Sequence, residues 1–477
     1  MNHKDLIDNY LADSLNVDST SIIQNNFNPT LTFNRFDVAF KLMYLQSFST
    51  DEKSEFSMKC YKEHLKAFSL GTFREPGNSQ KRNFDSYLHV FHQLTSDMKE
   101  QGFDPNKSLV PLANDGSILN GAHRTSIGIY LNKQLSVLKT NLPPANFDFK
   151  FFKRRGVSNE ILDAATQIFI KYDNTCHIAL IWPSAEGFDK LLEEKFLHII
   201  YFKQVNLTPK GAHNLISQVY KGETWLGSRH HHFPGIKGKQ VQCFAKKGAL
   251  RVYVFQSNTI DNVLGIKNEI RDIFKIGKHS IHITDTHDEA IELGQLLFNE
   301  NSIHALNNAT LTKYPEITQE ICHFYHLIVA SSLKTEKFIL TPDITMAIYG
   351  LKKTSSLDFF TTYQQTITKH LNSPYAKQIE LWPDRLSADY ILNNPNCYFW
   401  YNGLKIYSVK QAAKLISMSN SKNSKYDAKR LHKIYQRPQL SIILSNLQYR
   451  YLFMKEKIIM LKKIKLKKLK QYLTKLQ

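Results

Sequence analysis

A mixed α/β or α+β fold, divided into more than one domain, is the fold class that the sequence predicts. The chain has 477 residues, which is more than a single hydrophobic core ordinarily serves. Its hydrophobic content of 42% is typical of globular proteins, so sizeable cores are expected. Strand-like segments alternate with segments of helical spacing along much of the chain. These observations predict two or three domains in which helices pack on sheets.

The first half of the chain is expected to begin with helices and to continue as alternating strands and helices. Residues 1–30 are polar and weakly periodic, which predicts a loosely attached lead-in. Apolar residues recur every three to four positions between 33 and 99, with a Gly/Pro/charge break at 71–83, which predicts helices. The elements expected next are strand 108–112, helix 123–131, strand 135–139, strand 147–152, helix 160–171 and strand 177–182.

The second half is expected to form another α/β domain. A stretch rich in Gly, His and Lys at 222–238 marks the transition to it. The elements expected beyond are strand 250–255, helix 262–274, strand 280–283 and helix 289–298. The predicted division is therefore a domain at 31–205, a connection at 206–240, a domain at 241–440 and a basic helix at 441–477.

Hydropathy and cysteine usage exclude several classes of protein. No run of eighteen or more apolar residues is present, and the first residues lack the layout of a secretion signal. The five cysteines lie at least 67 residues apart, which matches neither a disulfide framework nor a zinc-ligand pattern. A cytoplasmic protein with ordinary buried thiols is therefore expected.

The basic charge of the chain is concentrated at its end. The formal net charge is +20, and nine lysines with one acid between 455 and 475 supply +8 of it. On a helical wheel the apolar residues of this tail gather on one side, interrupted by Lys462 and Lys465. Such a helix suits an anionic membrane surface, at about 1 kcal/mol per nearby lysine. Attraction to nucleic acid and a merely solvated helix are the alternatives, and we favour the membrane surface.

A turn between a predicted strand and a predicted helix carries the strongest functional signal. Asp115-Gly116 is a tight-turn pair, and Gly121 can take positive φ or let a ligand approach the backbone closely. His123 and Arg124 stand where the helix begins, and free N–H groups there favour an anion that Arg can clamp. The turn is thus predicted to bind phosphate. A hairpin turn with both side chains as local caps is the alternative.

The same segment resembles a known signature. Asp-Gly-x-x-x-x-Gly-Ala-His-Arg, starting at Asp115, is similar to the motif of the ParB/sulfiredoxin-like superfamily. This resemblance implies a ParB-like N-terminal domain that binds a phosphate or a nucleotide. Sulfiredoxin has Cys before its His-Arg pair, where this chain has Ala122, so sulfinic-acid reduction is not expected. Partition proteins carry a helix-turn-helix after this domain, and the sequence offers no convincing one.

A second candidate is the Gly-rich, basic and aromatic stretch at 220–239. Such segments suit close approach to a phosphorylated or sugar ligand, so Lys237 and Lys239 are predicted to bind the donor. The adjacent His230, His231 and His232 could not all face one metal ion from a strand, because neighbouring side chains point to opposite faces. A zinc site, a solvated functional loop and a plain surface connection remain alternatives.

A third candidate lies at the end of a predicted strand. It offers possible metal ligands, which are His282, Asp285, His287 and Asp288. Thr286-x-x-Glu289 can instead be a capping box with acids on the first helical turn. The two interpretations are compatible, because α/β proteins bind ligands where strands end and helices begin. Asp285 is therefore predicted to be a catalytic base or a metal ligand.

A fourth candidate is Asp358. A Gly ahead of an Asp-x-Asp pair would form a nucleotidyltransferase-like metal site, but Ser356 occupies the first Asp position. A single carboxylate is a poor Mg²⁺ site. The second domain is thus expected to be either a degenerate nucleotidyltransferase-like fold or, at this point, an edge strand ending in a turn. Mg²⁺ is the one cofactor that these acids suggest.

Several short blocks between 35 and 435 resemble proteins encoded in bacterial capsule and O-antigen loci. This resemblance implies a transferase that moves a sugar or phosphosugar from a phosphate-bearing donor to a growing glycan, at the cytoplasmic face of the membrane. In that case His123 and Arg124 would bind the donor phosphate, and His123, Asp285 and Asp358 would act in catalysis. Removing Arg124 would cost ~1.5–3 kcal/mol of phosphate binding.

Two other functions fit the same residues. One is a ParB-like nucleotide-dependent DNA-binding or regulatory protein, which would bind duplex DNA sequence-selectively even without residues 450–477. Salt-steep binding that vanishes with this tail would be nonspecific attraction alone. The other is a small-molecule kinase, which would turn over ATP with a free hydroxyl substrate.

Overall fold

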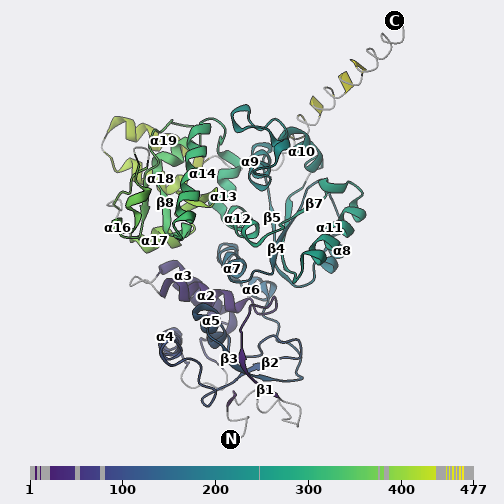
Figure 1. The fold of residues 1–477 in the computed structure, drawn as a ribbon, viewed down its shortest axis with the longest axis vertical. Helices are drawn as coiled ribbons and strands as arrows, with labels where there is room; N and C mark the ends of the chain where they lie inside the picture. Colours follow the sequence, from purple (N-terminus) through teal and green to yellow (C-terminus); the bar gives the residue numbers. More distant parts are fainter. Residues whose placement is uncertain are drawn as a thin grey trace.

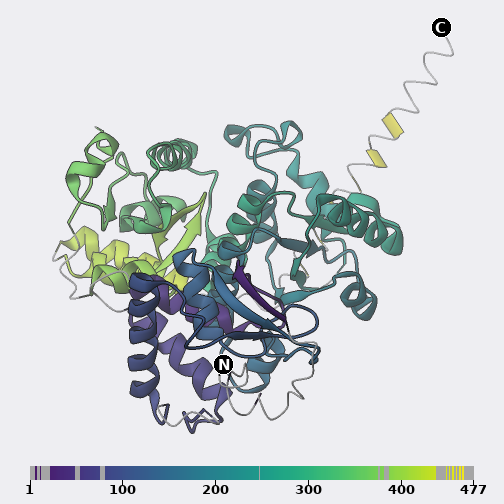
Figure 2. The ribbon, with the colours of Figure 1, turned by 60° about the horizontal axis from the view of Figure 1, so that its bottom comes forward.

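The computed structural model describes residues 22–48, 54–75, 81–246, 248–373, 376–380, 386–419 and 421–436, with single residues in both terminal segments. It is a mixed α/β structure, with 53% helix and 14% strand in three small sheets. We call the three parts that carry these sheets the N-terminal (22–157), middle (158–298) and C-terminal (299–436) domains. They lie at the bottom, upper right and upper left of Figure 1. In Figure 2 the N-terminal domain comes forward, in front of the other two.

The N-terminal domain is built on the sheet β1-β3-β2. Its elements are β1 (Ile22–Phe27), α2 (Asp37–Phe48), α3 (Glu55–Phe68), α4 (Phe84–Gln101), β2 (Val110–Leu112), α5 (Ala122–Leu131), β3 (Leu135–Lys139) and α6 (Phe149–Arg154). β2 and β3 are parallel and are connected through α5, while β1 is antiparallel to β3. α2 is buried almost all round because α3, α5 and α7 (Asn159–Tyr172) pack on it. The predicted helices and the strand–turn–helix order are confirmed.

Two predictions for this domain were wrong. Residues 1–30 were expected to be a loosely attached lead-in, but β1 lies within them and pairs with β3 in the sheet. Residues 147–152 were expected to form a strand, but α6 begins at Phe149. The Asp148 side chain accepts a hydrogen bond from Phe151 N at 2.8 Å, which caps the helix. Phe149 and Phe152, three residues apart, are buried on one face. Dense aromatic residues suggested a strand, and the capping Asp decided in favour of a helix.

The middle domain contains the sheet β5-β6-β4-β7, in which all neighbouring strands are antiparallel. Its strands are β4 (Cys176–Ile181), β5 (Ile199–Val205), β6 (Leu250–Gln256) and β7 (Ile281–Ile283). Successive side chains of β4 enter different cores: Ile178 and Leu180 join one, Ala179 and Ile181 the other. This explains why β4 is an unbroken apolar run. Because β5 and β6 are neighbours, the predicted connection at 206–240 lies inside this domain.

Helices cover both faces of the middle sheet. They are α7, α8 (Asp189–Lys195), α9 (Pro209–Val219), α10 (Ile236–Cys243), α11 (Ile260–Phe274) and α12 (His287–Leu297). α8 and α11 pack on the face of Ala179 and Ile181, whereas α7 and α12 pack on the opposite face. The core of that opposite face continues into the N-terminal domain through α2 and α7.

The C-terminal domain has its own core around the sheet β10-β11-β8-β9. Its elements are α13 (Glu300–Asn308), α14 (Pro315–Ala330), β8 (Phe338–Leu340), α15 (Pro342–Ile348), β9 (Phe359–Thr361), α16 (Gln365–Thr368), α17 (Ala388–Asn393), β10 (Tyr398–Tyr401), β11 (Leu404–Tyr407), α18 (Val409–Ser417) and α19 (Lys422–Tyr435). β10 and β11 form a hairpin through Asn402-Gly403, both at positive φ. α12 and α13 join this domain to the middle one, because both contact β10.

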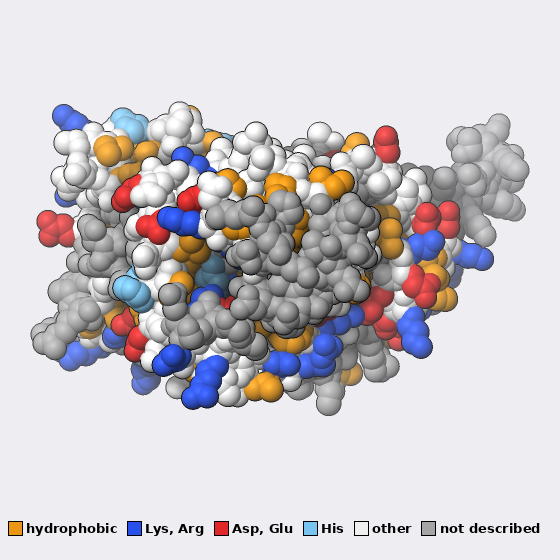
Figure 3. All heavy atoms as spheres, turned by 90° about the horizontal axis from the view of Figure 1, so that it is seen from below, with side chains coloured by type: hydrophobic (Ala, Val, Ile, Leu, Met, Phe, Trp, Pro, Cys, Tyr) orange, Lys and Arg blue, Asp and Glu red, His pale blue; other side chains and the backbone are white. Residues whose placement is uncertain are grey.

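Four of the five cysteines are buried, as expected, and Cys322 is partly exposed. The buried cysteines are Cys60, Cys176, Cys243 and Cys397. Where Figure 3 shows described atoms, the face seen from below carries basic and acidic side chains in mixture rather than one basic field. Among the described residues, no helix combines the length and the apolar character that crossing a membrane requires.

Candidate functional site

The turn between β2 and α5 adopts the predicted geometry. Gly116 has φ +83° and Gly121 has φ +86°, both in the left-handed region that glycine favours. Asp115 Oδ1 accepts hydrogen bonds from the backbone N of Ser117 at 2.9 Å and from its hydroxyl at 2.6 Å. Asn34 Nδ2 donates to Ser117 Oγ at 3.0 Å. Asp115 therefore holds the turn in shape through its own hydrogen bonds.

His123 points into the interior of the N-terminal domain. Its Nε2 lies 2.8 Å from the Tyr61 hydroxyl, and its ring meets Phe91 edge-on at 4.7 Å between centroids. Burial, followed by the charges of Lys81 and Lys41, holds the pKa of His123 well below its usual range. The imidazole is therefore neutral at pH 7, and it contributes no positive charge toward a phosphate.

Arg124 lies against the turn itself. Its Nη1 donates to the carbonyl oxygen of Leu109 at 3.0 Å. A Cβ added at Gly121 would lie 3.2 Å from Arg124 Nη2, so the glycine leaves room for the guanidinium. At least one donor of Arg124 is thus committed to the backbone that leads into β2. The prediction that Arg124 clamps a phosphate remains a prediction, and the geometry adds a structural role beside it.

The second and third sequence candidates meet in one pocket of the middle domain. The pocket has a volume of about 520 Å³. Its charged and titratable lining residues are Tyr220, Glu223, Lys239, Lys267, Arg271, Lys278, His279, His282, Asp285 and Glu289. We call it the cationic pocket, because four of these side chains are lysine or arginine. Tertiary folding therefore places the basic loop against the strand end that carries Asp285.

The loop at 220–239 reaches the pocket by folding back on itself. It forms two short 3₁₀ helices, η2 (Thr224–Leu226) and η3 (Arg229–His231), before α10 begins. Gly235 N donates to Leu226 O at 3.1 Å, and a Cβ at Gly235 would lie 1.9 Å from Trp225 O. Only glycine permits this approach. This close contact between Gly235 and Trp225 fixes where α10 begins, and therefore where Lys239 lies.

Positive charges converge in the cationic pocket. Lys239 Nζ donates to Lys278 O at 2.7 Å and lies 5.1 Å from the centre of the Tyr220 ring. Burial lowers the pKa of Lys239, and the neighbouring charges of Lys278 and Arg271 lower it further. Arg271 Nε is buried, with no hydrogen-bond partner among the described residues. A bound anion would offset this repulsion and supply the missing acceptor.

Asp285 is held at the edge of the same pocket. Its Oδ1 pairs with Lys267 Nζ at 2.7 Å, and Lys267 is only 8% exposed. Its backbone N donates to Glu289 Oε2 at 2.7 Å, while Thr286 Oγ1 accepts from Glu289 N at 3.2 Å. The predicted N-cap at Thr286 is therefore confirmed, but the capping box is incomplete, because the Glu289 side chain accepts from Asp285 N rather than from Thr286 N. More than half of the Asp285 side chain remains exposed, so its carboxylate can reach a ligand.

His282 forms the inner wall of the pocket, and its burial predicts a pH dependence of stability. Its ring lies 5.2 Å from that of Tyr220. Burial, and next the charge of Lys267, lowers the pKa of His282 to about 4. The unfolded chain, with a pKa near 6.5, binds the extra proton first, so stability is lost as the pH falls from about 6.5 toward 4. Between pH 7 and pH 5 the loss attributable to His282 is about 2 kcal/mol.

Urea denaturation at both pH values measures this loss. The His282→Gln protein should lose about 2 kcal/mol less than wild type on acidification. His323→Gln, at an exposed position, should behave as wild type. An unchanged pH dependence in His282→Gln would contradict the buried, neutral imidazole.

The other predicted site residues lie apart from the cationic pocket. Lys237 is exposed and is not part of the lining. Asp358 precedes β9, the edge strand of the C-terminal sheet, and its Oδ2 accepts from Ser356 Oγ at 3.4 Å. An edge strand is present, but it begins at Phe359, after Asp358, instead of ending in a turn at this point. His231 Nδ1 is 2.8 Å from Ser228 Oγ. Within the described ranges, no three His, Cys, Asp or Glu side chains are placed to hold a metal ion.

Sequence analysis missed Lys267 and Arg271. Both lie on α11, four residues apart and therefore on one face of the helix. This spacing was visible in the sequence. What it lacked was any indication that α11 packs beside β7, where Asp285 follows.

Comparison with protein-family models, with curated proteins and with solved structures found no match to this chain. The site therefore stands on its own geometry.

Most of the basic tail lies outside the described residues. Tyr449 is described, and its ring stacks on Phe244 at the end of α10 with 5.4 Å between centroids. Its hydroxyl donates to Leu207 O at 3.1 Å, which anchors this point of the chain on the middle domain. Beyond it, the described Met454, Ile458, Leu461 and Leu466 are exposed helical residues.

Proposed function

We propose that the protein is a transferase of bacterial surface-polysaccharide synthesis that holds a phosphate-bearing sugar donor in the cationic pocket. The observation that carries the proposal is the convergence of Lys239, Arg271 and Lys278 on one pocket, where Arg271 Nε is buried and has no hydrogen-bond partner among the described residues. Phosphate oxygens are the acceptors that such a set binds most strongly. The resemblance to capsule and O-antigen proteins supports a glycan as the acceptor.

In this proposal the side chains of the pocket divide the work. Arg271, Lys239 and Lys278 neutralise the phosphate and stabilise the charge that develops on it as the bond to the sugar breaks. Asp285 accepts the proton of the attacking hydroxyl, held in place by Lys267. Neutral His282 adds no charge and shapes the inner wall. No step is assigned to a metal ion, because the described residues do not bring a ligand set together.

The exposed apolar and basic residues of the tail support a membrane-surface location for the glycan acceptor. This part of the proposal is independent of the pocket. Vesicles that contain anionic lipid test the membrane-surface location separately from the pocket. They should bind the tail without changing the affinity of the pocket for the donor.

Calorimetric titration with sugar nucleotides tests the proposal directly. The probes are the glucose, galactose and N-acetylglucosamine esters of uridine diphosphate, with uridine as the phosphate-free control. We expect at least one ester to bind more tightly than uridine, with an affinity that falls as salt rises. Equal affinity for uridine and for all three esters contradicts the proposal.

A further inference from the structure

Three cavities adjoin one another along α12. The cationic pocket shares Val219, His282 and Glu289 with a central cavity of about 90 Å³. The central cavity shares Gln295 and Trp400 with a cavity of about 340 Å³ that all three domains line, which we call the three-domain cavity. The three cavities therefore lie next to one another along α12, from the cationic pocket to the contact with the C-terminal domain.

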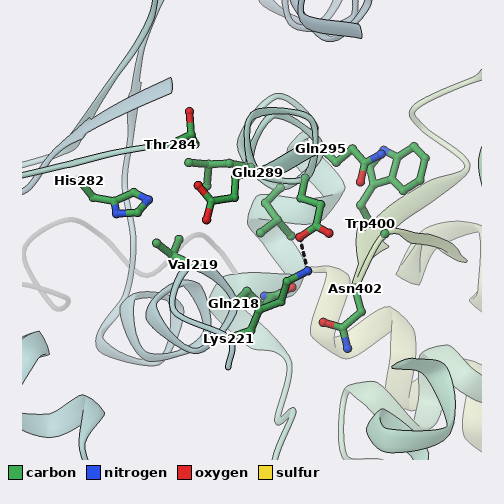
Figure 4. Close-up of a pocket in the computed structure, with 13 residues that line it drawn as sticks. Gln218, Val219, Lys221, His282, Thr284, Glu289, Gln295, Trp400 and Asn402 are labelled. Carbon is green, nitrogen blue, oxygen red and sulfur yellow. Dashed lines mark hydrogen bonds and ion pairs between the residues drawn. The ribbon is translucent and has the colours of Figure 1, made fainter. Parts of the chain in front are cut away.

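Two residues that line both the central cavity and the three-domain cavity carry buried polar atoms without a hydrogen-bond partner among the described residues. Gln295 Oε1, an acceptor, and Trp400 Nε1, a donor, are buried without a hydrogen-bond partner in the part of the chain that the structure describes. The Trp400 side chain comes from β10 and is only 6% exposed, whereas Gln295 comes from α12. Buried donors and acceptors are normally paired, so these two atoms mark a place for an occupant that hydrogen-bonds. Figure 4 shows both side chains in the wall of this cavity.

The chemistry of the cavity favours an uncharged occupant. Its cation, Lys221, is already paired with Glu292, as the dashed line in Figure 4 marks. The indole of Trp400 supplies an apolar ring edge beside its N–H donor, while Lys405 Nζ lies over the ring at 5.2 Å from its centre. The occupant should be uncharged, should both donate and accept hydrogen bonds, and should have an apolar face for the ring. A molecule with several hydroxyl groups and one apolar face has these properties. A sugar ring has these properties, and a volume of about 90 Å³ exceeds what a single water molecule needs.

We infer that the central cavity binds the sugar ring of a sugar phosphate, seated against Trp400 and Gln295, while its phosphate lies in the cationic pocket. This inference rests on the proposed function in one respect, which is that the cationic pocket binds phosphate. It goes further by assigning Trp400 and Gln295, which belong to different domains, as residues that recognise the sugar. The middle and C-terminal domains then form one binding site together.

Calorimetry with inorganic phosphate and with the α-1-phosphates of glucose, galactose, mannose and N-acetylglucosamine tests the inference. We expect at least one sugar phosphate to bind about tenfold more tightly than inorganic phosphate. In Trp400→Phe, which keeps an aromatic ring but lacks the donor, and in Gln295→Leu, this excess should disappear while the affinity for inorganic phosphate stays unchanged. Gln365→Leu, on an exposed helix of the C-terminal domain, is the matched control and should retain the excess.

Each outcome decides the inference. It is overturned if no sugar phosphate binds more tightly than inorganic phosphate, or if the excess survives in both variants. Far-ultraviolet circular dichroism shows whether each variant folds, and Gln295→Leu provides the test on its own if Trp400→Phe does not. If inorganic phosphate and the sugar phosphates all fail to bind, the proposed function fails as well. If inorganic phosphate binds without any sugar preference, the inference alone fails.

Discussion

Replacing Arg271 with glutamine is expected to weaken the binding of phosphate-bearing ligands by roughly ten- to a hundredfold. A charge-assisted hydrogen bond contributes about 1.5–3 kcal/mol, and Arg271 brings a buried donor that has no partner among the described residues. Glutamine is shorter than arginine but keeps a polar end near the position of Nε, and it removes the charge. Calorimetric titration with inorganic pyrophosphate, at low and at moderate salt, measures the loss.

The same substitution should leave stability unchanged or raise it. Arg271 lies close enough to Lys239 for its charge to lower the pKa of that lysine, and this repulsion destabilises the pocket while no anion is bound. A loss of ligand binding without a loss of stability is expected of a residue whose role is to bind the ligand rather than to stabilise the fold.

Two further variants serve as controls for the loss of binding in Arg271→Gln. Lys237→Gln removes the same charge two residues from Lys239, at an exposed position outside the pocket, and should bind pyrophosphate as wild type does. Arg124→Ala tests the turn before α5 as the alternative phosphate site. If Arg124→Ala loses binding and Arg271→Gln does not, the phosphate site lies in the N-terminal domain and the cationic pocket is wrongly assigned.

Replacing Asp37 with asparagine is expected to lower the free energy of unfolding by about 3–5 kcal/mol, the cost of leaving buried charges without their partner. Asp37 is 1% exposed, and it pairs with Arg35 Nε at 2.9 Å and with Lys41 Nζ at 3.0 Å. Both cations are themselves 3% exposed, so solvent cannot compensate them. Urea denaturation at neutral pH measures the change. An exposed pair offers the matched control, because Asp104→Asn should change stability by less than about 1 kcal/mol.

This buried network also predicts an acid response. Burial alone would raise the pKa of Asp37, but the charges of Arg35 and Lys41 outweigh it and hold the pKa well below its usual range. A carboxyl whose pKa is lowered by folding stabilises the protein above its unfolded pKa, and this contribution is lost as the pH falls below about 4. Asp37→Asn should therefore lose less stability on acidification than wild type. A stability within about 1 kcal/mol of wild type at neutral pH would contradict the role of the network.

The network links stability to the turn that carries the sequence motif. Arg35 Nη1 donates to the carbonyl oxygen of Ile118, so the cation that pairs with Asp37 also holds the chain between Asp115 and Gly121. The Asp37 variant is thus expected to disturb this turn first. Hydrogen exchange measures this effect. In the Asp37 variant the amides of the turn should exchange faster than in wild type, whereas those of the C-terminal domain should be less affected.

Local sequence specified the elements whose signals lie within a few residues. α5 and β3 follow their apolar spacing, and the cap of α12 follows Thr286 and Glu289. The segment expected as a strand at 147–152 forms α6 because Asp148 caps it, and this signal is also local to the sequence. Such features depend on helix and strand propensity and on hydrogen bonds between residues close in the sequence, so the sequence alone can predict them.

The charge and orientation of the predicted site residues depend on their burial, which cannot be predicted from the local sequence. His123 and Arg124 stand at the start of a helix, as the motif implied. The packing of Tyr61 and Phe91 nevertheless turns the His123 ring inward and keeps it neutral. The residue type suggested a phosphate ligand, and the surrounding aromatic side chains determined its charge.

The candidate sites differ in how far sequence could predict them. Lys239 and Asp285 were chosen separately, each from its own short motif, 46 residues apart in the chain. Only the tertiary structure brings them to one pocket, because β6, α11 and β7 must first pack before the basic loop can face the end of β7. The sugar site needs a further step, since Gln295 and Trp400 come from different domains. Residue types and turns are local properties of the chain, whereas the electrostatics of a pocket arise from charges that folding brings together and removes from water.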